Sequence, residues 1–297
     1  TIFLSLALAL LVEKVRENRF GKGLPLALFT RQEPVMRKFH QAALLCLAIG
    51  LALASLVILN SAYLHLGNIK QLKLDTFFLG FSFPISLISM SVIFSLMKHE
   101  KVGITKILKE CSFWMINLGV IVFFLFILAN MFRAQVAIAT ALFLTVAYIF
   151  WLYWHQGIQL QQKAFLTSGI LFLLITSITG IAYILLAMSP YYLPQYSHPL
   201  LRLHAFTALY GWNLSGLMVI GRHGDFPLQL HSSKIIGLHW LTVLILCPLG
   251  YFFPAFAIAA VFSYALLLYH LLFNKGAVDE SLRARQDKQL ATDVNNL

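Results

Sequence analysis

Charged residues are scarce in this chain, and their scarcity excludes a water-soluble fold. Only 11% of the 297 residues are Asp, Glu, Lys or Arg, whereas 60% are hydrophobic and the mean hydropathy is +0.81. Soluble globular domains carry about 25% charged residues. A chain of this composition would leave a large apolar surface in water, so the sequence predicts an all-α polytopic membrane protein embedded in the lipid bilayer.

Acidic residues are scarcer than basic residues, but the resulting excess of positive charge does not indicate nucleic-acid binding. The chain has 22 Lys and Arg against 11 Asp and Glu, which gives a formal net charge of +11. Nucleic-acid binding requires a basic face on a folded domain. Here the cations occur in short runs between long apolar stretches, which is typical of the loops that orient membrane proteins.

Cysteines are few, and the motifs of soluble enzymes are missing. Cys46, Cys111 and Cys247 are scattered within apolar segments and form no CxxC pair, which excludes a secreted disulfide framework. The sequence contains no HExxH, no CxxCH haem-attachment site, no P-loop and no glycine-rich dinucleotide turn. Soluble enzyme chemistry therefore has no support.

Long apolar runs are what the chain has instead. Eight of them reach the roughly 20 residues needed to span a bilayer, namely 39–66, 74–97, 112–132, 134–154, 164–188, 199–221, 233–253 and 254–274. The run 1–12 is about half that length, which leaves open a truncated span, an interfacial helix or a signal-like segment. The predicted organisation is an N-terminal apolar segment and basic stretch (1–38), a first four-helix repeat (39–155), a second repeat (156–274) and a polar tail (275–297).

The loops differ in charge according to the side on which they lie. Most of the 22 Lys and Arg residues fall on one side, and the exceptions are Lys70, Lys73, Arg133 and Arg202. The positive-inside rule assigns the basic side, which includes the tail, to the cytoplasm. The sequence therefore predicts a multi-pass protein of the inner (cytoplasmic) membrane with a cytoplasmic C-terminus.

The two four-helix blocks resemble each other at the start of their second helices. The segment 72–75, LKLD, aligns with 201–204, LRLH, and the alignment continues without a gap to Ser86 and Ser215. Charged or polar residues thus recur at the same place in the topology. This recurrence predicts an internal repeat whose halves cross the membrane in the same direction.

Small and polar side chains follow one face of each second helix. In the second half they are His204, Ala208, Gly211 and Ser215, and in the first half they are Asp75, Ser82, Ser86 and Ser89. Such a stripe suits either close helix packing or a face turned toward a cofactor or polar cavity. Packing explains Gly and Ser, whereas a His and an Asp at equivalent positions in a membrane favour the functional interpretation.

Histidines are numerous, with ten in the chain, and four of them lie at depths that suit a cofactor. A b-type haem needs axial ligands at matching depth on different helices. His204 and His65 meet this condition near the outer side and are the candidate metal ligands. His239 and His270 meet it near the inner side, on adjacent antiparallel helices, and complete the candidate cofactor-binding set. The alternative is that these are unrelated polar residues, satisfied by backbone groups or water.

The stretch 202–212, RLHAFTALYGW, resembles the H-x-x-x-x-L-x-G-W pattern of haem-copper-oxidase-subunit-I-like membrane proteins. It is also similar to the nitric-oxide-response family of haem- and copper-containing membrane proteins. The resemblance implies four-helix units whose haem or copper histidines lie on the second helix, as His204 does. It thus implies haem b, with copper as a further candidate. The chain departs from these families in two ways: Asp75 stands where a second ligand is expected, and there are eight predicted spans instead of twelve. A single haem, or a scaffold without metal, therefore fits better than a complete oxygen- or nitric-oxide-reducing centre.

The sequence leaves three hypotheses for function. The first is a haem-binding protein of redox, gas-response or respiratory type, such as one for nitric-oxide tolerance. The second is a transporter or channel, in which Pro84, Gly180 and Pro248 would break helices near a substrate path. The third is an accessory subunit of a respiratory complex without its own cofactor, whose partners are other membrane subunits or a redox partner.

Overall fold

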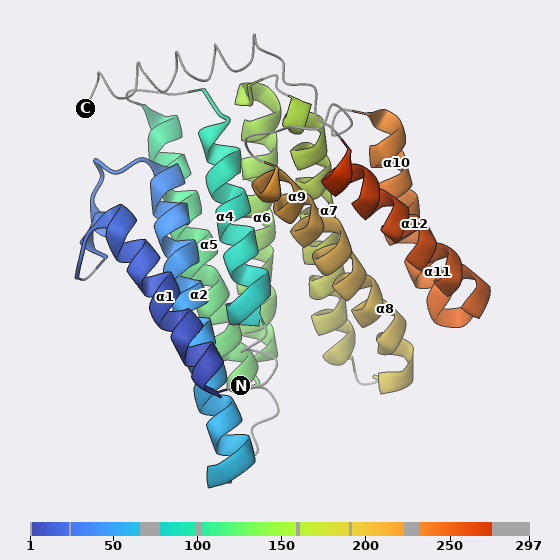
Figure 1. Ribbon diagram of the computed structural model, residues 1–297. Coiled ribbons are helices and arrows are strands. Elements are labelled where there is room, and N and C mark those ends of the chain that lie inside the picture. Colours follow the sequence, from blue (N-terminus) through green and yellow to red (C-terminus); the bar gives the residue numbers. More distant parts are fainter. Residues whose placement is uncertain are drawn as a thin grey trace.

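The structure is a computed structural model that describes residues 2–23, 25–65, 78–98, 103–158, 161–189, 192–222 and 232–274. Within these ranges the chain is helical, and its one extended contact is an isolated bridge between Met97 and Gly157. A helix satisfies all of its own backbone groups, which a bilayer requires because lipid offers no hydrogen-bond partner. The helices stand side by side (Figure 1). The all-α prediction is confirmed for the described part of the chain.

Six of the described helices are long and apolar enough to cross a bilayer. They are Val35–Leu64, Ile104–Leu128, Phe132–Gln156, Lys163–Ala187, Ser233–Phe252 and Pro254–Phe273. At a rise of about 1.5 Å per residue, a helix of 20 residues covers the hydrocarbon core of about 30 Å. The architecture is that of a multi-pass membrane protein.

Two of the six spans combine α-helix with a short π-helical segment. The elements that form the six spans are α2 (Val35–Leu59) with η2 (Asn60–Leu64), α5 (Ile104–Leu128), α6 (Phe132–Gln156), α7 (Gln161–Ala187), α10 (Ser233–Leu241) with η6 (Thr242–Leu246) and α11 (Cys247–Phe252), and α12 (Pro254–Phe273). The π-helical turns are rare in proteins and are frequent at functional sites.

The other two expected spans, 74–97 and 199–221, are not among these six. The first lies partly outside the described residues and continues as η3 (Phe78–Ser82) and α4 (Phe83–Ser95), which together form a shorter apolar helix. The second is an unbroken helix made of α8 (Pro194–Phe206), η4 (Thr207–Asn213) and α9 (Leu214–Gly221). Both helices stand among the six in the bundle (Figure 1).

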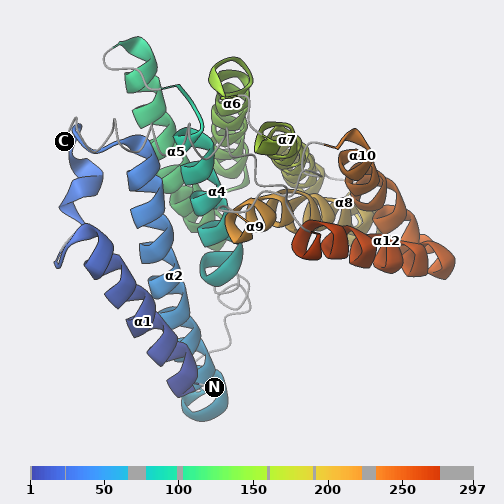
Figure 2. The ribbon, with the colours of Figure 1, turned by 45° about the horizontal axis from the view of Figure 1, so that its top comes forward.

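The N-terminal apolar run belongs to α1 (Ile2–Phe20), which packs antiparallel along α2 at one edge of the bundle (Figure 2). Near one end, the Ser5 hydroxyl donates to the backbone oxygen of Leu51 at 2.9 Å. At the other end, the Phe20 ring contacts the His40 ring with 5.5 Å between centroids. The apolar half of α1 therefore lies along the wall of a spanning helix.

The helices of the two predicted halves meet where α4 packs against α9 and α6 packs against α7. Within the second predicted half, α7 also packs against η4 and α9. A Cβ built on Gly216 of α9 would collide with the Ser89 side chain of α4. A Cβ built on Gly211 of η4 would lie 2.5 Å from Cγ of Phe172 on α7. Membrane helices associate mainly through such close packing, so these glycines set the spacing between the second helices and their neighbours.

Replacing Gly216 with Ala is expected to lower the free energy of unfolding by about 1–3 kcal/mol, because the new methyl group displaces the Ser89 hydroxyl and crowds the Ser89 Cβ on α4. Gly237→Ala is the matched control, since a Cβ on Gly237 meets nothing within 4 Å. Thermal unfolding in detergent measures both variants. Equal stability of the two variants would contradict the close packing of α4 on α9.

Candidate functional site

His204 lies in the last turn of α8, half-buried, with its ring turned onto α7. Its Nδ1 is 2.9 Å from the backbone oxygen of Thr176 and 3.4 Å from the hydroxyl of Thr179. A carbonyl oxygen can only accept a hydrogen bond, so Nδ1 carries the proton of the neutral ring. The lone pair of the imidazole is therefore on Nε2.

The surface of α7 beneath this ring is shaped by a glycine. A Cβ on Gly180 would lie 3.1 Å from Cε1 and 3.3 Å from Nδ1 of His204, which is closer than ordinary contact. The Thr176 hydroxyl also bonds the Thr207 hydroxyl at 2.9 Å, which ties α7 to the helix turn that follows His204. Gly180 leaves α7 unbroken, so its role is to admit the imidazole and not to break the helix.

The second helices of the two predicted halves contain π-helical segments at overlapping aligned positions. Under the alignment of segment 72–75 with segment 201–204, η3 (Phe78–Ser82) corresponds to residues 207–211, which lie within η4 (Thr207–Asn213). Pro84 follows η3 closely, and Pro248 follows η6 in the same way. Proline cannot donate the i→i−4 hydrogen bond, and a π-helical turn is one way in which the ladder of a membrane helix adjusts to it.

A polar network joins the two π-helical segments. The Asn213 side chain donates through Nδ2 to the Ser82 hydroxyl at 2.7 Å. Trp212 donates through Nε1 to the Ser86 hydroxyl at 2.8 Å, and that hydroxyl lies 2.9 Å from the backbone oxygen of Ser82. Ser82 and Ser86 were predicted site residues, whereas Trp212 and Asn213 were not. Asn213 could have been identified from the sequence, because it is an amide side chain in the interior of the expected span 199–221.

The predicted polar stripes lie at interfaces between helices. Four described residues of these stripes were candidate site residues, and all four are buried or half-buried, namely Ser82, Ser86, Gly211 and Ser215. A Cβ on Gly169 of α7 would lie 2.8 Å from Cβ of Ser215, so this part of the stripe serves close packing. The equivalence of Asp75 with His204 falls outside the described residues and stays a prediction.

His239 on α10 is completely buried between aromatic rings. Its ring centroid is 4.8 Å from that of Phe172 and 5.8 Å from that of Phe165, both on α7. Nε2 donates to the backbone oxygen of Tyr210 in η4 at 2.6 Å. In the neutral ring the lone pair is therefore on Nδ1, for which the described part of the chain offers no hydrogen-bond partner.

The other two predicted ligands lie near the ends of their helices. His270 is in the last turn of α12, where its Nδ1 lies 2.8 Å from Nδ2 of Asn274. His65 follows η2 with an exposed side chain and a φ of 50°. Within the described ranges, no hydrogen bond or ring contact joins His65 to His204 or His239 to His270. Both ligand pairings stay predictions.

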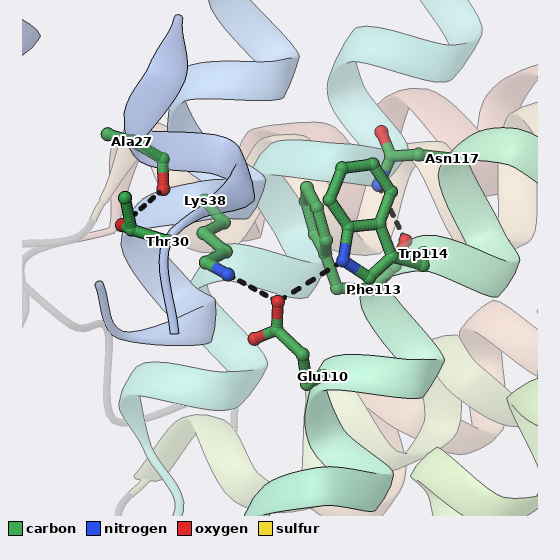
Figure 3. A network of polar contacts seen from close by, with 7 residues as sticks. All are labelled: Ala27, Thr30, Lys38, Glu110, Phe113, Trp114 and Asn117. Atoms are coloured by element: carbon green, nitrogen blue, oxygen red, sulfur yellow. Dashed lines mark hydrogen bonds and ion pairs between the residues drawn. The ribbon is translucent and has the colours of Figure 1, made fainter. Parts of the chain in front are cut away.

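An ion pair between a buried lysine on α2 and a half-buried glutamate on α5 was not expected from the sequence. The Lys38 ammonium, which is completely buried, pairs with the Glu110 carboxylate, and Trp114 donates to the same carboxylate oxygen at 3.2 Å (Figure 3). The expected spans begin at residues 39 and 112 and leave both charges in loops, whereas the helices begin at Val35 and Ile104. Lys38 and Glu110 therefore both lie within helices, and their side chains meet between α2 and α5.

The donor set suits a cofactor with one or two protein ligands. Among the described residues, no group of three or more His, Cys, Asp or Glu side chains lies close enough together to hold a metal ion. A haem needs one or two axial ligands from the protein. A metal-bound histidine usually donates its other ring N–H to a carbonyl or carboxylate, and His204 has this arrangement through Thr176.

Replacing His239 with Leu is expected to destabilise the protein by about 1–3 kcal/mol, because the Tyr210 carbonyl loses its donor inside the bundle. His239→Gln keeps an N–H donor of similar reach, so its loss of stability should be clearly smaller than that of His239→Leu. Thermal unfolding compares the two, with His270→Leu at a helix end as a control. Wild-type stability in His239→Leu would show that this hydrogen bond does not hold α10 against η4.

Comparisons with known proteins identify no relative of the chain. No protein-family model, no curated protein and no solved structure matches it. The candidate site therefore rests on the residues and geometry of this chain.

Proposed function

We propose that the chain is an integral membrane protein that binds haem b through His204 and has a redox, gas-response or respiratory role. One observation carries the proposal. The hydrogen bond from Nδ1 of His204 to the backbone oxygen of Thr176 leaves a neutral imidazole with its lone pair on Nε2. This is the form of histidine that binds haem iron.

The surroundings of His204 fit this role. Thr176 fixes which ring nitrogen carries the proton, and Gly180 admits the ring against α7. Groups that orient a ligand in this way also raise its basicity. Bound haem would supply electron transfer or the binding of a diatomic gas, and His204 would hold its iron as an axial ligand.

The same proposal includes eight spans in two four-helix repeats. Besides the overlap of η3 with η4, the offset that aligns residue 75 with residue 204 also aligns Ile104 with Ser233, the first residues of α5 and α10. It further aligns Glu110 with His239, and each of these ionisable residues contacts a neighbouring helix of its own half. Recurring helix starts and ionisable positions support a repeated unit.

We further propose that the basic side faces the cytoplasm of a cell with an inner membrane. Cations of this side cap the C-terminal ends of helices. Lys163 donates to the backbone oxygens of Trp154, in the last turn of α6, and of Gly157, which follows α6, at 3.1 and 3.0 Å. Arg222 donates to the backbone oxygen of Leu272 at the end of α12, at 2.6 Å. These bonds satisfy carbonyls that a helix leaves unpaired at its end.

The test is an absorption spectrum of the purified, reduced protein from cells supplied with ample haem. A Soret band with the α and β bands of b-type haem is expected. Protein that is folded and helical but has no such bands would contradict the proposal.

A second candidate function is transport, which is favoured by the polar network between η3 and η4. Asn213 and Ser82 form a hydrogen-bonded pair where two helices with π-helical turns meet, and irregular helices line substrate sites in many transporters. Solute flux in proteoliposomes that Asp75→Asn abolishes would favour this function. Haem bands without any flux would exclude it.

A further inference from the structure

The stretch 14–38, which runs from α1 through the connection into the first turn of α2, is rich in cations, and only some of them are paired with a carboxylate. Three pair with carboxylates of the chain, since Arg16 pairs with Glu13, Arg37 with Glu33 and Lys38 with Glu110. Four others are exposed and form no ion pair with any described residue, namely Lys14, Arg19, Lys22 and Arg31.

Two large apolar side chains are exposed between these cations. Leu26 and Phe29 lie on the short 3-10 turn η1 (Leu26–Phe29), and their exposed fractions are 66% and 67%. Leu28 of the same turn is buried in the core of the bundle. The turn thus inserts one side chain into the protein and presents two outward, beside the cations.

The turn is fixed to the bundle and does not hang free. The Phe29 ring packs on the Trp114 ring with 5.1 Å between centroids. Trp114 is in turn held by the carboxylate of Glu110, which pairs with the buried Lys38 (Figure 3). The Thr30 hydroxyl closes the turn by donating to the backbone oxygen of Ala27 at 3.0 Å. The exposed side chains are therefore held in place before any partner arrives.

The depth of the segment indicates its partner. The first spanning helix begins at Val35, a few residues after Arg31, so the turn lies where the hydrocarbon core gives way to headgroups. Exposed apolar side chains flanked by Lys and Arg at this depth are the pattern of a membrane-surface binding element. Basic residues next to a span attract anionic lipid headgroups.

We propose that Lys14, Arg19, Lys22 and Arg31, with Leu26 and Phe29, form a binding surface for an anionic phospholipid of the bilayer. The cations bind the phosphate-bearing headgroup, and the two apolar side chains pack against the upper part of its acyl chains. The surface is independent of haem, so it stands or fails separately from the proposed function.

The test uses the full chain and a variant in which Lys14, Arg19, Lys22 and Arg31 are all replaced with Gln. Its control replaces Lys98, Lys106, Arg133 and Lys234 with Gln, which removes the same charge from exposed positions elsewhere. Native mass spectrometry counts the molecules of phosphatidylglycerol and phosphatidylcholine that each protein retains. Inorganic phosphate at the same concentration is the soluble probe.

Wild-type and control proteins are expected to retain phosphatidylglycerol in preference to phosphatidylcholine. Each cation near a membrane surface contributes about fivefold to lipid binding, so the first variant should bind phosphatidylglycerol at least about tenfold more weakly. Leu26→Ser with Phe29→Ser should weaken retention of both lipids. An equal loss in the control, wild-type retention in the first variant, or equal binding of inorganic phosphate would each overturn the proposal.

Discussion

Replacing Glu110 with Ala is expected to lower the free energy of unfolding by about 3–5 kcal/mol, which is the usual effect of removing one partner of a buried ion pair. Lys38 is completely buried, so its ammonium would remain in a low-dielectric interior without a counter-charge. Trp114 would also lose the acceptor of its indole N–H. Unfolding of the detergent-solubilised protein by heat or by a denaturing detergent measures the change.

Two controls isolate the buried charge as the cause. The double variant Lys38→Met with Glu110→Leu leaves no charge and should be markedly more stable than Glu110→Ala. Glu33→Ala breaks the pair with Arg37, whose side chain is 44% exposed, and should change stability by about 1 kcal/mol or less. If Glu110→Ala destabilised the protein no more than Glu33→Ala, the pair would not hold α2 against α5.

Replacing His204 with Ala is expected to abolish haem binding or to shift the Soret band strongly. The variant removes the imidazole whose lone pair on Nε2 is fixed by the bond to Thr176. Absorption spectra of protein made with ample haem measure the effect. His198→Ala is the matched control, because His198 lies on the same helix but is exposed, and it should keep the spectrum of the wild type.

A companion variant tests how His204 is positioned. Gly180→Ala places a methyl group about 3.1 Å from the His204 ring and should alter the haem spectrum without removing the ligand. His65→Ala tests the predicted second ligand in the same assay. Retention of the complete spectrum in His204→Ala would assign the iron to another residue.

The membrane class and most spans follow from composition, because a bilayer admits few folds and each span needs a long apolar run. The ends of the spans do not follow. Lys38 and Glu110 look like loop charges in the sequence, and only the packing of α2 on α5 shows that each neutralises the other. For a charge near the end of a span, the sequence gives neither its exact depth nor its partner on another helix.

The sequence singles out some of the candidate residues, but their contacts depend on how the helices pack. The pattern around residues 204–212 directed attention to His204, but its bond to Thr176 depends on how α8 packs on α7. The π-helical turns that bring Asn213 to Ser82 have no clear sequence signature apart from a nearby proline. Matching depth paired His239 with His270, whereas the hydrogen bond of His239 goes to Tyr210.

Titration of haem into the purified wild-type protein tests the central claim most directly. The change in Soret absorbance is expected to saturate at one haem per chain, because the proposal assigns the iron to a single site at His204, whose lone pair on Nε2 is fixed by the bond to Thr176. The His204→Ala protein, titrated in parallel, should show no saturable change. A wild-type titration that never saturates, or one that His204→Ala reproduces, would contradict the account.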